Sequence, residues 1–161
     1  HERFRRQRQM CIRDSGDVAS PGSVSLAISV GATTRDGAVW SNSSTGALTD
    51  RNGVVRDHPH MKPEVVAPGV RIISTGEDNL WYSSSGSSDA TVFVTGALAL
   101  ILEDQPHLKA QPNGNSSCLV EVKRALADSL ANGGDDHDPR GGYGLLDASL
   151  WLAEARSISA C

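Results

Sequence analysis

The chain has 161 residues, a formal net charge of −4, 39% hydrophobic residues and only 4% aromatic residues. That length suits one domain with its own core, or part of a larger domain. The acidic balance disfavours a nucleic-acid-binding protein, and no apolar run approaches the roughly 20 residues of a membrane-spanning helix. The three cysteines, Cys11, Cys118 and Cys161, form no C-x-x-C pair, which argues against a zinc ribbon or a disulfide framework.

The first fifteen residues differ from the rest because they hold five of the 15 basic residues. Translated back into codons in a single frame, Arg5 to Asp14 matches the transposase adapter used to make sequencing libraries. We therefore interpret residues 1–15 as translated adapter and leave them out of the fold. The remaining 146 residues carry 10 basic and 17 acidic side chains, so their net charge is −7.

From Gly16 onward, the sequence predicts one α/β unit in which short buried strands are followed by helices. A turn is predicted at residues 20–22, where proline and glycine follow a serine. Short apolar runs rich in β-branched residues predict buried strands. These predicted strands cover residues 26–30, 38–41, 65–67 and 70–73, and a polar surface loop is predicted over residues 43–60.

The segment 90–102 is apolar on almost all sides, which is typical of a helix buried in the centre of its domain. Pro106 prevents this helix from continuing. A second helix is predicted over residues 119–130, where leucine and valine recur at helical spacing, with Ser116 or Ser117 as its cap. The remaining predicted elements are a glycine-rich acidic loop over residues 133–144 and a last helix from about residue 147 to residue 155.

The main candidate for chemistry is the stretch Gly86-Ser87-Ser88-Asp89-Ala90. A serine in the first turn of a helix lies beside unpaired backbone N–H groups and the positive end of the helix dipole, and both can stabilise an oxyanion. Gly86 has no side chain where a substrate backbone would approach. Ser88 is therefore the candidate nucleophile, with Gly86 and Ser87 as candidate substrate-binding residues. An ordinary helix cap with small, closely packed residues would leave the same pattern.

Four blocks of this sequence, in order, resemble those of the subtilisin-like serine proteases, or subtilases. In that family the nucleophile lies in Gly-Thr-Ser-x-Ala-x-Pro, and here Ser87 stands for the threonine and Val92 for the proline. The other blocks are Ala27-Ile28-Ser29-Val30-Gly31-Ala32 after Pro21-Gly22, Lys62-Pro63-Glu64-Val65-Val66-Ala67-Pro68-Gly69, and Gly142-Tyr143-Gly144-Leu145-Leu146-Asp147-Ala148.

The resemblance implies a three-layer α/β fold with a mostly parallel sheet between helices, present only as its C-terminal half. Residues 16–157 would form the C-terminal part of the peptidase domain, and residues 158–161 an unassigned tail. It also implies a polypeptide substrate and a secreted, extracellular protein. We expect no nucleic-acid partner and no membrane-spanning segment, while the oligomeric state is open.

The family's mechanism would make Ser88 attack a peptide carbonyl while a histidine, oriented by an aspartate, accepts its proton. Both partners precede the serine in subtilases. Asp14-Ser15-Gly16 spells the aspartate motif, but we interpret it as a decoy because Asp14 belongs to the adapter segment. No histidine here precedes Gly-Thr or Gly-Ser, and Asn42 is not assigned as the oxyanion asparagine. We therefore expect the catalytic aspartate and histidine in a missing N-terminal part, and the fragment to be inactive. The alternative is a catalytically dead subtilase-like domain that serves as a binding or structural module.

The remaining motifs predict no cofactor. His58-Pro59-His60 is typical of a solvated loop rather than a metal site. Residues 135–138 lack the ligand spacing of a calcium loop, so no metal site is assigned, although the family resemblance leaves calcium open. Trp81 and Tyr82 are close enough in sequence to Ser88 to line a substrate cleft, and Cys118 is expected to pack as a small hydrophobic residue.

Overall fold

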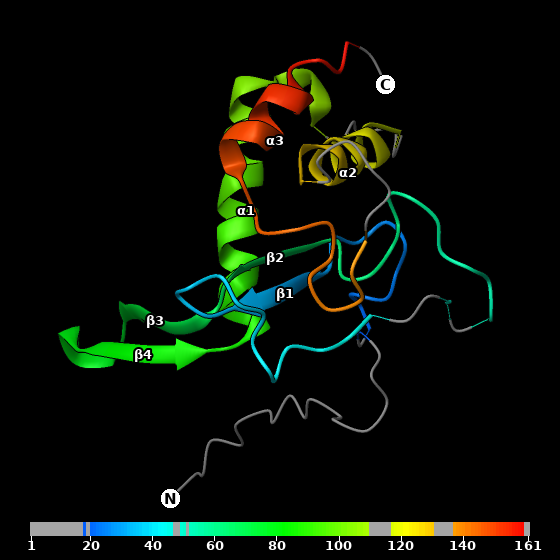
Figure 1. The fold of residues 1–161 in the computed structure, drawn as a ribbon. Helices are drawn as coiled ribbons and strands as arrows, with labels where there is room; N and C mark the ends of the chain where they lie inside the picture. Colours follow the sequence, from blue (N-terminus) through cyan, green and yellow to red (C-terminus); the bar gives the residue numbers. More distant parts are fainter. Residues whose placement is uncertain are drawn as a thin grey trace, which may run out of the picture.

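The computed structural model describes residues 18, 20–46, 49–50, 52–109, 117–130 and 137–159. The proposed adapter, residues 1–15, lies outside them. Figure 1 shows strands at one end of a long helix and two shorter helices near its other end. The elements are β1 (Val30–Thr33), β2 (Val65–Pro68), β3 (Val70–Thr75), η1 (Glu77–Asn79), β4 (Trp81–Ser85), α1 (Ser87–Asp104), η2 (Pro106–Leu108), α2 (Ser117–Leu130) and α3 (Ala148–Ala155).

Strands β1 and β2 form a parallel pair in which Val30 aligns with Val65. The chain at residues 144–146 runs along the other edge of β2, because Val66 N donates to Gly144 O at 3.0 Å and Leu146 N donates to Val66 O at 2.8 Å. The strand predicted at residues 65–67 is confirmed and is buried throughout. An α/β fold with a parallel sheet packed against helices is therefore confirmed.

The strand predicted at residues 26–30 is wrong, because β1 begins only at Val30. Residues 20–27 form turns instead, closed by hydrogen bonds such as Ala27 N to Val24 O at 3.1 Å. Leu26 is 41% exposed, and the carbonyl of Ala27 accepts hydrogen bonds from buried lysine side chains rather than from a strand. The predicted strand at residues 38–41 is also wrong, since it is reduced to one bridge between Thr33 and Val39.

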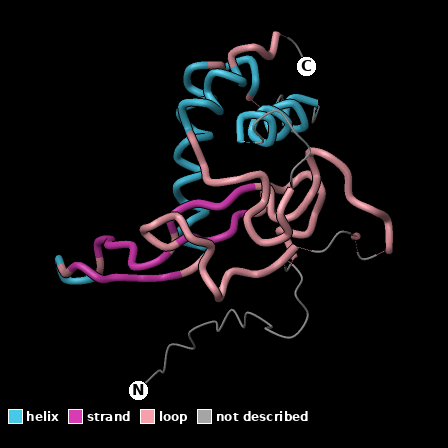
Figure 2. Tube along the Cα trace, viewed as in Figure 1, coloured by secondary structure: helices cyan, strands magenta, loops and turns pink. Residues whose placement is uncertain are grey.

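Strands β3 and β4 form an antiparallel hairpin that extends away from the helices (Figure 1, Figure 2). The sequence predicted β3 but placed it in the core, whereas Ile73 is 71% exposed. It missed β4 altogether, because a serine-rich stretch has little of the apolar alternation that marks a strand. The strand forms because its backbone pairs with β3, and not because its own side chains favour a strand.

Helix α1 is confirmed, but the prediction that it is buried on all sides is wrong for the described structure. Its buried side chains share one face, which packs on β1 and β2: Ala90, Val94, Ala97 and Ile101. On the outward side, Val92 is 69% exposed, Phe93 44% and Leu100 66%.

Helices α2 and α3 are confirmed and pack against each other. Asp147 caps α3, because its Oδ1 accepts hydrogen bonds from the backbone N–H groups of Ser149 and Leu150 at 2.9 and 3.0 Å. Trp151 is fully buried and donates its indole N–H to Val122 O at 3.1 Å, which links the two helices. Cys118, expected to be a simple packing residue, is disulfide-bonded instead.

Candidate active site

The candidate nucleophile lies at the elbow between β4 and α1, which hydrogen bonds from three sides hold in place. Gly86 N donates to Gly69 O at 2.7 Å, in the turn between β2 and β3. Ser85 Oγ accepts from Arg71 N at 2.9 Å. Ser84 Oγ donates to Asp89 Oδ1 at 2.5 Å, which ties the end of β4 to the first turn of α1. The elbow is therefore fixed by both strands of the hairpin and by the helix itself.

The elbow also depends on a close approach at Gly69. A Cβ atom there would lie 2.7 Å from Ala32 Cβ, 2.7 Å from Gly86 O and 3.1 Å from Ala90 Cβ. The two contacts of 2.7 Å are shorter than a Cβ atom tolerates, so glycine lets β1, the turn after β2 and the start of α1 approach one another here. The sequence block around Gly69 thus positions Ser88 although it is nineteen residues away.

Ser88 is the second residue of α1 and is exposed to solvent. Its backbone N–H belongs to the first turn, where no helical carbonyl is available to accept it. Gly86 caps the helix in an extended conformation, and Ser87 O accepts a hydrogen bond from Thr91 Oγ1 at 2.8 Å. The three predicted site residues thus lie together at the positive end of the α1 dipole. An exposed hydroxyl beside a backbone N–H of the first turn provides two of the groups that acyl transfer needs, a nucleophile and an oxyanion donor, but not the base.

The aromatic residues expected near Ser88 lie elsewhere. Trp81 and Tyr82 are the first residues of β4, whereas the elbow follows its last residue. Both are exposed, and the Tyr82 ring comes close to Gly76 at the turn of the hairpin. The structure therefore does not bring them beside Ser88.

The four described histidines contact groups away from the elbow. His58 Nε2 lies 2.9 Å from Asp128 Oδ1 on α2, while His60 Nδ1 lies 3.0 Å from Ser25 O. His107 and His137 contact the backbone carbonyls of residues 158 and 63. His58 and His60 thus have separate partners, and the acidic residues 135 and 136 lie outside the described part of the chain.

The sequence did not predict a buried charge cluster formed by Lys62, Glu64 and Lys123. All three side chains are at most 1% exposed, and Glu64 Oε1 lies 2.5 Å from Lys62 Nζ and 2.6 Å from Lys123 Nζ. Glu64 Oε2 accepts Ser29 N at 2.7 Å, and both ammonium groups also donate to Ala27 O. The cluster therefore joins the turns before β1 to β2 and α2. Lys123 lies 59 residues from Glu64, so no local pattern could have revealed the pairing.

The pKa of Lys62 falls to about 8 because burial disfavours its charged form. Attraction by Glu64 acts in the opposite direction, and repulsion from Lys123 adds to the lowering. This is the behaviour of an ammonium group that shares one carboxylate with a second ammonium group.

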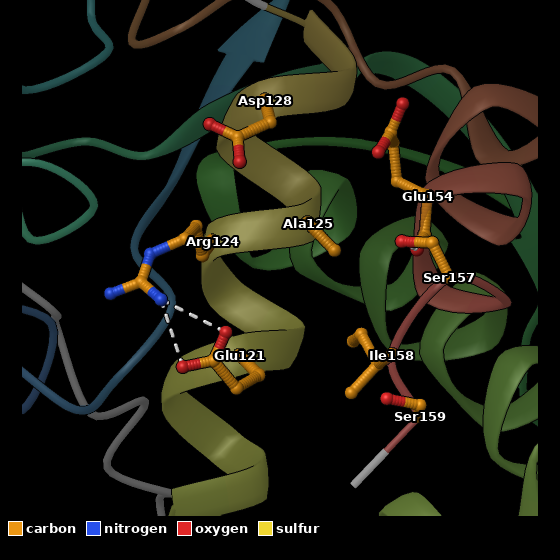
Figure 3. Close-up of a pocket in the computed structure, with 8 residues that line it drawn as sticks. All are labelled: Glu121, Arg124, Ala125, Asp128, Glu154, Ser157, Ile158 and Ser159. Atoms are coloured by element: carbon orange, nitrogen blue, oxygen red, sulfur yellow. Dashed lines mark hydrogen bonds and ion pairs between the residues drawn. The ribbon is translucent and has the colours of Figure 1, made fainter. Parts of the chain in front are cut away.

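A pocket of about 330 Å³ lies between α2 on one side and the end of α3 with the segment that follows it on the other (Figure 3). Its wall on α2 includes Arg124, whose Nη1 lies 2.8 Å from Glu121 Oε1. Ser88 is not among the residues that line it.

None of the helices in the described part of the chain is long and apolar enough to cross a bilayer.

Comparison with known proteins assigns this architecture to a family. The sequence pattern of the subtilase family, peptidase S8, matches residues 11–144. The chain belongs to the subtilase family. The match begins at residue 11, inside the segment that we interpret as adapter, and it includes the elbow with Ser88.

Curated subtilases resemble the chain over only part of their length. Serine protease AprX of Bacillus subtilis (strain 168) is 32% identical over an alignment of 149 residues that covers 84% of this chain and 31% of AprX. Subtilisin DY of Bacillus licheniformis is 39% identical over 72 residues, 45% of this chain and 23% of that protein. The chain thus spans about a third or less of these relatives.

Solved subtilase structures confirm the fold. The CspB protease of Clostridium perfringens is 27% identical with a TM-score of 0.64, over 86% of this chain and 29% of that one. The self-cleaved protease domain of PatA is 21% identical with a TM-score of 0.59, over 85% of this chain and 44% of that one, and it supports the fold alone. The described residues therefore have a subtilase fold that corresponds to less than half of either solved chain.

Proposed function

We propose that the protein is a serine endopeptidase in which Ser88 is the nucleophile and polypeptides are the substrates. The observation that carries this proposal is the place of Ser88: an exposed hydroxyl in the first turn of α1, held by the elbow, in a chain of the subtilase family. Gly86 and Ser87 would bind the substrate backbone next to it. No cofactor is required for this chemistry.

In the proposed reaction, Ser88 Oγ attacks the carbonyl carbon of the scissile peptide bond, and a histidine accepts the hydroxyl proton. The Ser88 backbone N–H and the α1 dipole favour the negative charge that develops on the carbonyl oxygen. Collapse of this intermediate breaks the C–N bond, and the histidine returns the proton to the leaving amine. Water then attacks the acyl-serine ester while the histidine accepts its proton, and Ser88 leaves and regains its proton from the histidine.

The histidine and the aspartate that orients it would be supplied by sequence preceding Gly16, with residues 1–15 being adapter. Two observations support this part of the proposal. The four described histidines contact other groups, and α1 leaves Val92, Phe93 and Leu100 exposed on one side. An N-terminal part of the domain that packs on this side would cover the apolar face and bring in the base. The 161-residue chain by itself would then be inactive, because an unassisted serine hydroxyl is a weak nucleophile.

The test is labelling with a serine-directed fluorophosphonate, followed by identification of the labelled peptide. We expect the complete protein that contains this chain to be labelled at Ser88, and Ser88→Ala to remove the label. Ser83→Ala, on exposed β4, is the matched control and should be labelled as the wild type is. A label that survives Ser88→Ala, or a folded complete protein without any label, would reject the proposed role.

The alternative, a subtilase-like domain without activity that binds a partner or has a structural role, makes a different prediction about the natural gene. Genomic sequence upstream of the Gly16 codon should encode Asp-Ser/Thr-Gly and His-Gly-Thr/Ser motifs if the protein is a protease. An upstream frame that lacks either motif would favour the inactive domain. The same sequence would show whether a secretion signal supports the extracellular location that we propose, and whether the RRQRQMCIRD segment is natural.

A further inference from the structure

The position that a Cβ atom would occupy on Gly86 is open, and two atoms border it. A Cβ atom on Gly86 would lie 3.6 Å from Asp89 Oδ2 and 3.7 Å from Ser88 N. Apart from the chain neighbours of Gly86, no other atom of the described residues comes within 4 Å of that point. A group at this point therefore lies near the backbone nitrogen of Ser88 and near one carboxylate oxygen.

Asp89 is held so that one of its oxygens borders this space. Its Oδ1 accepts the hydroxyl of Ser84 at 2.5 Å, which leaves Oδ2 beside Gly86. As the third residue of α1, Asp89 also benefits from the positive end of the helix dipole. Among the described residues, no lysine or arginine forms an ion pair with it. The carboxylate is half-buried, and none of the ion pairs of the described residues neutralises its charge.

This charge affects the proposed reaction. An oxyanion that forms beside the Ser88 N–H would place negative charge near the Asp89 carboxylate, and like charges at such range repel each other. A cationic group on the substrate would offset the repulsion, because it could pair with Asp89 Oδ2 while the carbonyl oxygen turns toward the N–H. A neutral or acidic substrate offers no such compensation.

We propose that Asp89 is a specificity-determining residue, which makes the enzyme prefer peptides with a lysine or arginine side chain next to the scissile bond. This inference rests on the proposed function of Ser88. It predicts a preference that is electrostatic in origin, so salt should weaken it. It also predicts that the preference depends on the charge of Asp89 and not on negative charge elsewhere on the hairpin.

The experiment measures kcat/KM of the complete protein for peptides that differ only in a lysine, glutamine or glutamate on either side of the scissile bond. The variants are Asp89→Asn, which keeps the shape and removes the charge, and Asp89→Glu, which keeps the charge. Asp78→Asn is the matched control, because it removes one negative charge at the turn of the β3–β4 hairpin, where the residue already has a positive φ that asparagine tolerates. Fluorophosphonate labelling at Ser88 checks that each variant has an intact site.

We expect the lysine-over-glutamine ratio to fall about fivefold in Asp89→Asn, the size of an exposed ion pair, and to persist in Asp89→Glu and Asp78→Asn. High salt should lower the ratio in the wild type toward that of Asp89→Asn. An unchanged ratio in Asp89→Asn, or an equal loss in Asp78→Asn, would overturn the inference while leaving Ser88 as the nucleophile. Absence of any Ser88-dependent hydrolysis or labelling in the wild type would instead overturn the proposed function, and the inference with it.

Discussion

Both faces of α1 carry apolar side chains, but the two faces have opposite surroundings in the structure. Ala97 and Ile101 lie in the core, where α1 packs on β1 and β2, whereas Val92 and Leu100 face outward with more than half of their surface exposed. The apolar character of a helix therefore does not by itself show which of its sides is covered. If the domain continues beyond this chain, as we propose, the outward face of α1 is where that part would pack.

The usual distribution of polar and apolar side chains is reversed in two places. The outward face of α1 exposes Phe93 and Leu100, while the interior holds Lys62, Glu64 and Lys123. Buried charges are tolerated only when they are paired and hydrogen-bonded, which the cluster achieves with one carboxylate and several backbone carbonyls. Polarity alone would therefore place these residues on the wrong side of the boundary between interior and surface.

The largest expected effect on stability separates two adjacent residues, Ile101 and Leu100, which lie on opposite faces of α1. Ile101→Ala removes a side chain that is 1% exposed, and we expect it to lower the free energy of unfolding by about 2–5 kcal/mol. Leu100→Ala removes one that is 66% exposed, and we expect a change below about 0.5 kcal/mol. Urea unfolding of the 161-residue chain, followed by circular dichroism, measures both.

Measuring the same two substitutions in the complete protein tests whether the outward face of α1 is covered there. If sequence outside this chain covers the outward face, Leu100→Ala should there cost about 2 kcal/mol or more, because the side chain would be buried. Similar, small effects of Leu100→Ala in both settings would show that nothing packs on this face.

The next effect should be that of Gly69→Ala, at the point where α1 meets the sheet. The added methyl group would lie 2.7 Å from both Ala32 Cβ and Gly86 O, so one of them must move. We expect a loss of about 1–3 kcal/mol in the free energy of unfolding. Because Gly86 leads into Ser88, the rate of fluorophosphonate labelling of the complete protein should fall as well. Gly53→Ala is the control. Gly53 is exposed and has a positive φ, and a Cβ there would contact nothing within 4 Å, so this substitution introduces backbone strain without a steric clash.

A smaller effect, visible as a pH dependence, should come from the buried charges. The pKa of Lys62 is lowered to about 8 from its ordinary value of 10.5, so the unfolded state binds the proton more tightly than the folded state does. Stability should therefore rise as the pH increases from about 8 to 10.5 and should be level, as far as this group is concerned, outside that window. Lys62→Met should abolish the rise, while Glu64 keeps Lys123 as its partner. A slope of the same size in Lys62→Met would assign the pH dependence to another group.

Much of the fold, and the place of the candidate nucleophile, followed from the sequence, because the signals involved are local. The helix after Gly86 is marked by a long apolar run, and Ser88 is marked by its position in the first turn. The elements that were missed depend on distant partners. Strand β4 is polar and ordered by β3, and Lys123 is buried by Glu64. The Ser84–Asp89 hydrogen bond had a weak local signal, a hydroxyl and a carboxylate that flank Gly86, but spacing alone does not show that they meet.

The smallest effect should be that of Gly96→Ala, which tests the outward face without removing any contact. Gly96 lies in the middle of α1, and a Cβ atom there would meet nothing within 4 Å. In the 161-residue chain, alanine should raise the free energy of unfolding by about 0.5–1 kcal/mol, because glycine is the weaker helix former. If another part of the domain packs closely on this face, the same methyl group would be forced into a tight interface, and the complete protein should lose stability instead. A change of sign between the two settings would therefore place the covering segment directly over Gly96, whereas a gain in both would place it elsewhere.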